Sequence, residues 1–219
     1  MFGDRQPDTG YYIEMFNDLT VSNVLTVIVC LLVSMTIHEF MHAFMGFKLG
    51  DTTAMEHGRV SFNPLQHIDP VMTILLPAVT LLLFHAPILA AKPVPFDPRR
   101  LKYDEYGAAL LAAAGPLSNL VLAFLSALLL RFVDLGSFLD QAVAFLVELN
   151  VALFVFNLVP IPPLDGSRVL YAFAPEVVRD IMDQIEPYGF FIIFALVLWS
   201  SGALNVLTNL NNFVLNLLP

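Results

Sequence analysis

Charged residues are scarce in this chain of 219 residues and make up 13% of it, whereas average soluble domains carry about a quarter. Hydrophobic residues make up 58%. This composition excludes a soluble globular protein. It predicts an integral membrane protein surrounded by a lipid bilayer, and the length indicates one domain.

Basic residues and cysteine are also few. The net charge at pH 7 is −9, and the densest basic group is Arg99, Arg100 and Lys102, so no nucleic-acid partner is expected. The single cysteine, Cys30, lies in an apolar run and cannot form an internal disulfide. Residues 1–18 are polar and acidic rather than basic, so we expect no secretory signal peptide and a first span that stays in the mature protein.

Long apolar runs divide the chain. A bilayer crossing takes about 20 residues, and we predict spans at residues 19–47, 107–130 and 142–159. Two further runs are interrupted, residues 71–91 by prolines and residues 188–218 by Ser-Ser-Gly. The prolines favour a re-entrant element at 71–91 that dips into the membrane and returns, because proline breaks a helix.

A short strand is predicted at residues 58–64, because GRVSFNP is rich in β-branched and aromatic residues and closes in Asn-Pro. The predicted fold class is therefore an all-α polytopic membrane protein. It is a helical bundle with a short strand and a re-entrant element between the first span and the span that contains Gly-Pro.

Three ionisable residues, His38, Glu39 and His42, lie in the first span as the motif HEFMH. Two histidines four apart share one helix face, which is the spacing with which two imidazoles hold one zinc ion, with the glutamate beside it as general base. The alternative is a pair of hydrogen-bonded core histidines with a salt-bridged glutamate. The cost of ionisable groups in lipid argues against that alternative.

A catalytic zinc usually has three protein ligands, so one more is needed. The extended metzincin motif would place a histidine where the chain has Lys48. The best remaining acid is Asp165, which follows Pro160, Pro162 and Pro163. Prolines at membrane depth free backbone carbonyls, which are tolerated only where protein or a water-filled cavity satisfies them, and a metal site fits there. The alternative is an ordinary helix-end aspartate at the membrane surface.

Three motifs in this order resemble the site-2 protease family of intramembrane zinc metalloproteases. They are HEFMH in the first span, AAGPLSN at 113–119 and NLVPIPPLDG at 157–166. The segments GRVSFNPLQHIDP and KPVPFDPR are also similar to the compact prokaryotic branch without a PDZ domain. The resemblance implies a single membrane-embedded metalloprotease domain over residues 1–219. Its parts are a polar tail at 1–18, a catalytic core at 19–168 and C-terminal helices at 169–219.

The resemblance also implies the site. One Zn²⁺ per chain would be held by His38, His42 and Asp165. Glu39 would be the catalytic acid and base, and Asn157 would have a polar assisting role, such as stabilising the oxyanion. For Asn157 a helix-to-helix hydrogen bond, or a cap for the carbonyls freed by Pro160, is an equally open alternative. For Asn119, the last residue of AAGPLSN, helix packing is favoured over a catalytic role.

The function implied is cleavage of a transmembrane segment of a membrane-protein substrate in the prokaryotic cell (inner) membrane. A membrane zinc carrier or channel is the alternative. If residues 71–91 return to the side they left, all basic residues except Arg5 and Arg131 share one side. By the positive-inside rule that side is cytoplasmic, so the active site is expected nearer the cytoplasm.

Overall fold

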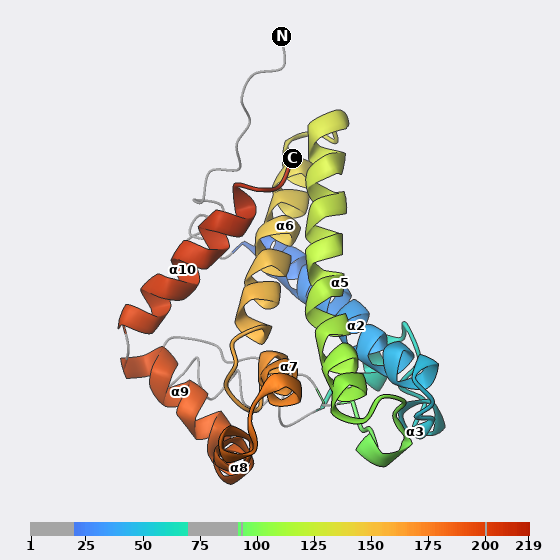
Figure 1. Ribbon diagram of the computed structural model, residues 1–219. Helices are drawn as coiled ribbons and strands as arrows, with labels where there is room; N and C mark the ends of the chain where they lie inside the picture. The colour runs from blue at the N-terminus through green and yellow to red at the C-terminus, as the bar shows by residue number, and fades with distance from the viewer. Residues whose placement is uncertain (1–19, 70–91, 93, 200) are drawn as a thin grey trace.

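The computed structural model describes residues 20–69, 92, 94–199 and 201–219. The re-entrant element expected at 71–91 lies outside these residues. Every regular element in the described part is helical (Figure 1). In chain order these are α2 (Val21–Lys48), α3 (Thr53–Glu56), η1 (Pro64–Gln66), η3 (Pro98–Arg100), α5 (Asp104–Phe132), α6 (Ser137–Asn157), α7 (Asp165–Phe173), α8 (Glu176–Ile185), η4 (Glu186–Tyr188), α9 (Gly189–Trp199) and α10 (Ser201–Leu215).

Helices α2, α5 and α6 are long and apolar enough to cross a membrane. They coincide with the three spans predicted from the sequence. Helix α2 begins after Thr20, whose side chain accepts a hydrogen bond from the backbone of Asn23. Helix α5 carries Pro116 in its interior, beside Gly115. Proline is tolerated in a membrane helix where neighbouring groups satisfy the carbonyl that it frees.

The strand predicted at 58–64 is wrong, because the segment forms turns that run into η1. Gly58 has a positive φ of 69° and ends the turn after α3. The side chain of Arg59 is buried and donates to the carbonyls of Gln66 and Lys92, and the side chain of Asn63 caps η1. A strand needs a partner strand, and composition alone does not supply one.

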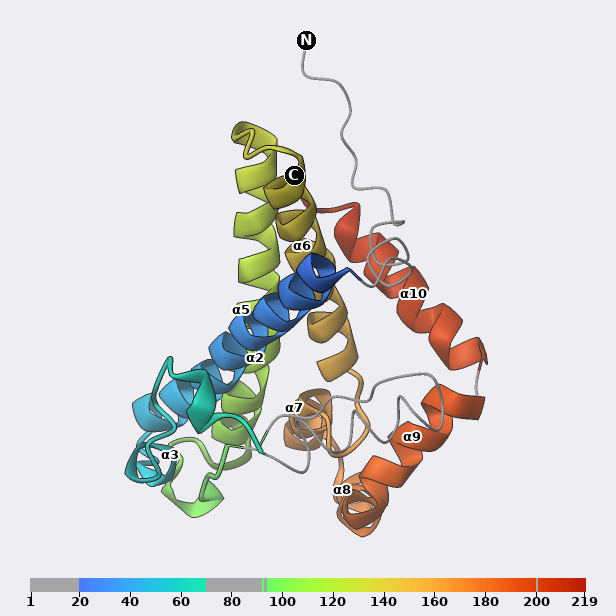
Figure 2. The same ribbon diagram turned by 180° about the vertical axis from the view of Figure 1, so that it is seen from behind.

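Helix α5 is central, because it packs against α2, α6 and α7. Figures 1 and 2 show α5 and α6 side by side, with α2 crossing them. Small residues bring α5 and α6 together, since Ala123 and Ala127 pack against Val147, Val151 and Val155 of α6.

The end of α2 is joined to the start of α5 by the backbone. The N–H of Lys102 donates to the carbonyl of Leu49 at 2.8 Å. The chain therefore runs along α2 to one end of the bundle, back along α5, and again to the first end along α6 (Figure 1). As a result, the C-terminal ends of α2 and α6 lie at the same end of the bundle.

Candidate metal centre

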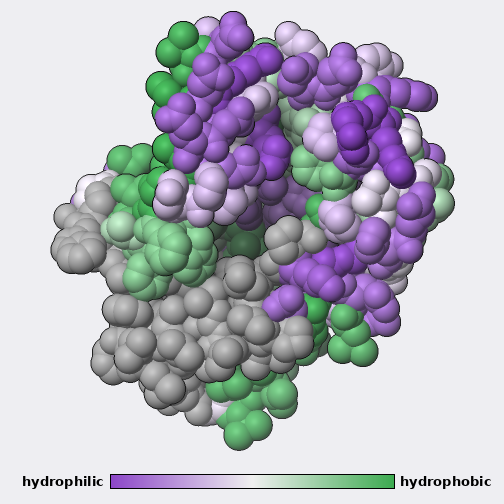
Figure 3. Space-filling view, turned by 90° about the horizontal axis from the view of Figure 1, so that it is seen from below, coloured by the Kyte–Doolittle hydropathy of each residue, from purple (hydrophilic) through white to green (hydrophobic). Residues whose placement is uncertain are grey.

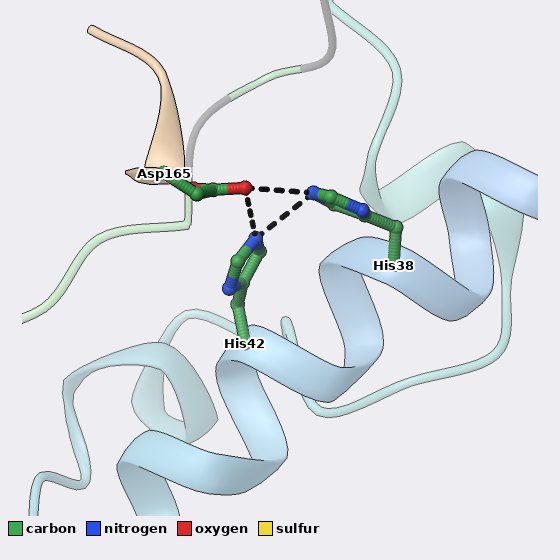
Figure 4. A group of neighbouring side chains, drawn as sticks. All are labelled: His38, His42 and Asp165. Atoms are coloured by element: carbon green, nitrogen blue, oxygen red, sulfur yellow. Dashed lines mark hydrogen bonds and ion pairs between the residues drawn. The ribbon is translucent and has the colours of Figure 1, made fainter. Parts of the chain in front are cut away.

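Two histidines of α2 and an aspartate of α7 converge on one point (Figure 4). The Nε2 atoms of His38 and His42 are 3.0 Å apart. Oδ2 of Asp165 lies 3.2 Å from the first of these atoms and 3.3 Å from the second. Both histidines are buried. The structure thus brings together the three residues that the sequence nominated as zinc ligands.

Asp165 reaches this point because α6 ends just before it. Helix α6 stops at Asn157, and the prolines that follow cannot continue it. Asp165 then begins α7. A Cβ on Gly166 would lie 2.2 Å from the carbonyl oxygen of Leu158, so only glycine allows α7 to start against the end of α6.

A third helix, α5, places Gly115, a residue without a side chain, against the two imidazoles. A Cβ added to Gly115 would lie 2.3 Å from Nε2 of His42 and 2.7 Å from Nε2 of His38. Any side chain here would fill the space between the ligand atoms. The glycine of AAGPLSN therefore leaves that space open.

Hydrogen bonds fix the tautomers of both rings. Nδ1 of His42 lies 2.9 Å from the carbonyl oxygen of Leu111, which can only accept, so this nitrogen carries the proton. Nδ1 of His38 lies 2.6 Å from Oδ1 of Asn119 and donates to it. Metal-binding histidines are held by outer partners of this kind.

The orientation of the Asn119 amide is set by a buried polar chain across α2, α5 and α6. Nδ2 of Asn119 donates to Oδ1 of Asn150 at 2.7 Å. Nδ2 of Asn150 donates to Oγ of Ser34 at 2.9 Å. The side chains of all three residues are fully buried. Because the amide nitrogen of Asn119 points to Asn150, its oxygen is left for His38.

These bonds leave three acceptors facing one another. Neutral rings protonated at Nδ1 present bare lone pairs at Nε2, and the Asp165 carboxylate adds a third acceptor. Such a cluster needs a cation. Ligand atoms about 2.0–2.2 Å from a tetrahedral zinc ion are about 3.2–3.6 Å apart, which is close to the spacing of 3.0–3.3 Å seen here. His38, His42 and Asp165 therefore fit a zinc ion that keeps its fourth position open.

Glu39 is buried beside these ligands on α2. Its negative charge also acts on the guanidinium of Arg59. Burial lowers the pKa of Arg59, while Glu39 and Asp69 raise it. A carboxylate is thus held next to the metal ligands and close to a buried cation.

The other two asparagines of the motifs differ in their contacts. Asn157, the last residue of α6, donates to the carbonyl of Leu153 on its own helix at 2.9 Å, so its assisting role stays a prediction. Asn119 contacts His38 directly and orients it, which is more than the helix packing favoured from the sequence. Sequence reasoning gave no role to Ser34 or Asn150. The sequence did show Asn150 as a polar side chain inside a predicted span, and this could have indicated a hydrogen bond to another helix.

Comparison with known proteins identifies relatives that are named as putative zinc metalloproteases. The family model for peptidase family M50 matches residues 133–200. The putative zinc metalloprotease YwhC of Bacillus subtilis is 38% identical over 185 residues, which cover 80% of this chain and 81% of YwhC. The putative zinc metalloprotease Rip2 of Mycolicibacterium smegmatis is 30% identical over 179 residues, with coverages of 76% and 64%.

An archaeal protein, the putative zinc metalloprotease MJ0611 of Methanocaldococcus jannaschii, is 33% identical over 133 residues, with coverages of 61% and 62%. No solved structure matches the chain. The similarity to YwhC spans most of both proteins, and the three acceptors of the site suit the metal that these relatives' names give. The chain therefore belongs to peptidase family M50, the site-2 protease family, and is a membrane zinc metalloprotease with Zn²⁺ as its cofactor.

Proposed function

We propose that the protein hydrolyses peptide bonds within or near the transmembrane segments of membrane proteins. The observation that carries this proposal is the position of the ligands. His38 and His42 are buried within α2, a helix long and apolar enough to span the bilayer, and Gly115 of another such helix closes over them. A metal site built inside spanning helices suits a substrate that is itself in the membrane.

The zinc ion, Glu39 and Asn157 would each have a separate role in peptide hydrolysis. Zinc, when bound, supplies the Lewis acid that activates water and polarises the scissile carbonyl. Glu39 accepts the proton of the attacking water and passes it to the leaving amine. An amide nitrogen has two hydrogens, and Asn157 uses one of them for the carbonyl of Leu153. The second remains to stabilise the developing oxyanion.

A polar cleft offers water a route to this end of the bundle. It has a volume of about 450 Å³ and is lined by residues that include Ser167, two positions after Asp165, and the charged side chains of Arg168 and Asp104. Figure 3 shows hydrophilic residues gathered around a hollow on this face. Hydrolysis inside a membrane needs such a path, because the bilayer core holds no water.

The same end is proposed to face the cytoplasm. Basic residues gather there, on the end of α2, around η3 and on α7 and α8, and they are Lys48, Arg59, Arg99, Arg100, Lys102, Arg168 and Arg179. At the opposite end of α5 lies Arg131. Positive loops mark the cytoplasmic side of a cell membrane. The active site would then lie nearer the cytoplasmic face of a prokaryotic cell membrane.

The experiment is a comparison of the wild type with Glu39→Gln in vesicles that contain a membrane-spanning peptide. A protease predicts about one zinc per chain in both proteins and cleavage by the wild type alone, because glutamine keeps the shape but cannot accept the proton. A zinc carrier, the other function considered from the sequence, predicts metal flux that survives the substitution. Cleavage by Glu39→Gln at the wild-type rate, or flux without cleavage in the wild type, would overturn the proposal.

A further inference from the structure

Asparagines form a stripe along one face of α10. They are Asn205, Asn209 and Asn212, with Asn216 just past the end of the helix. Three of them are exposed and Asn212 is partly exposed. No hydrogen bond engages any of the four amide side chains within the described part of the chain.

The opposite face of α10 packs against the membrane spans. Leu207, Val214 and Leu218 contact the cluster formed by α5 and α6, which includes Val147 and Val151. At 3.6 residues per turn, Leu207 and Val214 point roughly opposite to the asparagines of α10, while Leu218 lies past the end of the helix. The stripe therefore faces away from the bundle.

The packing also sets the depth of the stripe. Val147 and Val151 lie in the middle of α6, a candidate span. Figures 1 and 2 both show α10 alongside α6. Amides at this depth face hydrocarbon, where a polar group without a hydrogen bond is expensive. Because the described residues supply no partner for the stripe, we expect a polar partner in the membrane.

We propose that this partner is a second copy of the protein, so that two chains pair through the asparagine stripe (Asn205, Asn209, Asn212 and Asn216). An asparagine amide both donates and accepts, so the stripe complements itself. Within α10 its spacing of four and three residues is that of a helix–helix seam. Two copies inserted in the same orientation bring the stripe together about a two-fold axis along the membrane normal. A foreign helix would have to supply matching polar residues, whereas a second copy always does.

Cysteine cross-linking in the native membrane tests the contact. Cys30→Ser removes the one natural thiol. In that background, Asn209→Cys is compared with Phe213→Cys, which lies on a neighbouring face and is 62% exposed. After mild oxidation we expect several-fold more disulfide-linked dimer from Asn209→Cys. Equal yields, no dimer, or a cross-link from Asn209→Cys to a different protein would overturn the proposal.

A second measurement removes the amides. The triple variant Asn205→Leu, Asn209→Leu, Asn212→Leu is labelled for energy transfer between copies in phosphatidylcholine vesicles, and its association is expected to weaken at least tenfold. Thr208→Leu is the matched control, because the Thr208 hydroxyl is exposed but already donates to the carbonyl of Leu204. Bound zinc reports that both variants are folded. Unchanged association in the triple variant would refute the pairing.

Discussion

Gly115 of α5 and His42 of α2 approach so closely that a Cβ on the glycine would lie 2.3 Å from Nε2 of the imidazole. The two residues are far apart in the sequence and belong to different spans. Their contact makes the backbone of α5 one wall of the metal centre. It also gives the glycine of AAGPLSN a role that helix propensity does not explain.

Replacement of this glycine should empty the site without unfolding the helix. Alanine is the better helix former, but in Gly115→Ala the methyl group would occupy the space between the imidazole nitrogens. We expect bound zinc to fall at least tenfold, and proteolysis with it, while circular dichroism stays helical. Zinc per chain in the purified protein is the measurement.

Gly46→Ala is the matched control for this variant. Its Cβ would meet Cδ1 of Leu111 at 3.1 Å, and that flexible side chain can move aside. Zinc should stay near one per chain. Equal zinc loss in both variants would show that any added methyl between α2 and α5 disturbs the bundle, and the special role of Gly115 would be wrong.

Removal of the Asn150 amide should weaken zinc binding, although Asn150 does not touch a zinc ligand. Asn150 reaches His38 only through Asn119. In Asn150→Leu the amide of Asn119 loses its short bond and keeps only the bond of 3.5 Å to the carbonyl of Ser34, so we expect zinc affinity to fall about 10- to 100-fold, as for outer partners of other metal sites. Competition with a fluorescent chelator gives the affinity.

A restoring variant distinguishes positioning from simple destabilisation. Asn150→Asp keeps an oxygen that accepts from Asn119, so its zinc affinity should lie nearer the wild type than that of Asn150→Leu. If both variants bind zinc as the wild type does, Asn150 does not position His38.

The two histidine ligands could be predicted from a local rule, whereas Asp165 was chosen because a catalytic zinc needs a third protein ligand and because the order of the motifs resembles a known family. His38 and His42 share a helix face by their spacing, and Asp165 follows prolines that must end a helix. The three spans follow from run length and hydropathy. None of these inferences requires knowledge of which helices touch.

Features that depend on contacts between distant segments could not be predicted in this way. Ser34 and Asn150 meet across 116 positions of sequence, and no spacing rule joins them. The strand at 58–64 failed for the same reason. Its composition suits a strand, but the buried side chain of Arg59 instead ties the segment to the carbonyls of Gln66 and Lys92.

Removal of the metal should abolish proteolysis reversibly. Zinc is held by three ligands that only the folded chain brings together and so stabilises the folded state, and the metal-free protein should therefore lose thermal stability as well as activity. Dialysis against 1,10-phenanthroline, with melting followed by circular dichroism, is expected to lower both, and equimolar zinc should restore both. The variant Asp165→Ala should melt at the same temperature with and without the chelator, because it lacks the third ligand. A wild-type protein that cleaves its substrate normally after complete removal of zinc would contradict this prediction.

The buried carboxylate of Asp51, which lies outside the metal centre, should contribute to thermal stability but not to zinc binding. Asp51 is 1% exposed, and its oxygens accept from the backbone and hydroxyl of Thr53 and from the backbone N–H of Asp97 at 2.8 Å. It thereby ties the end of α2 to the connection that leads into α5. In Asp51→Ala these donors lose their acceptor, which costs about 1–3 kcal/mol for each buried group left unsatisfied. The melting temperature should fall by several degrees, while zinc per chain at low temperature stays unchanged because no ligand or ligand partner is altered.

Glu56→Gln supplies the comparison for Asp51→Ala. The Glu56 carboxylate also accepts a hydroxyl hydrogen bond, from Thr52, and pairs with Arg100 at 3.7 Å. Its side chain is 56% exposed, however, and exposed pairs contribute little because water replaces them. The melting temperature of Glu56→Gln should therefore match the wild type. If the two variants melt at the same temperature, burial does not set the strength of these contacts. If Asp51→Ala loses zinc, the connection between α2 and α5 helps to hold the two helices at the metal centre.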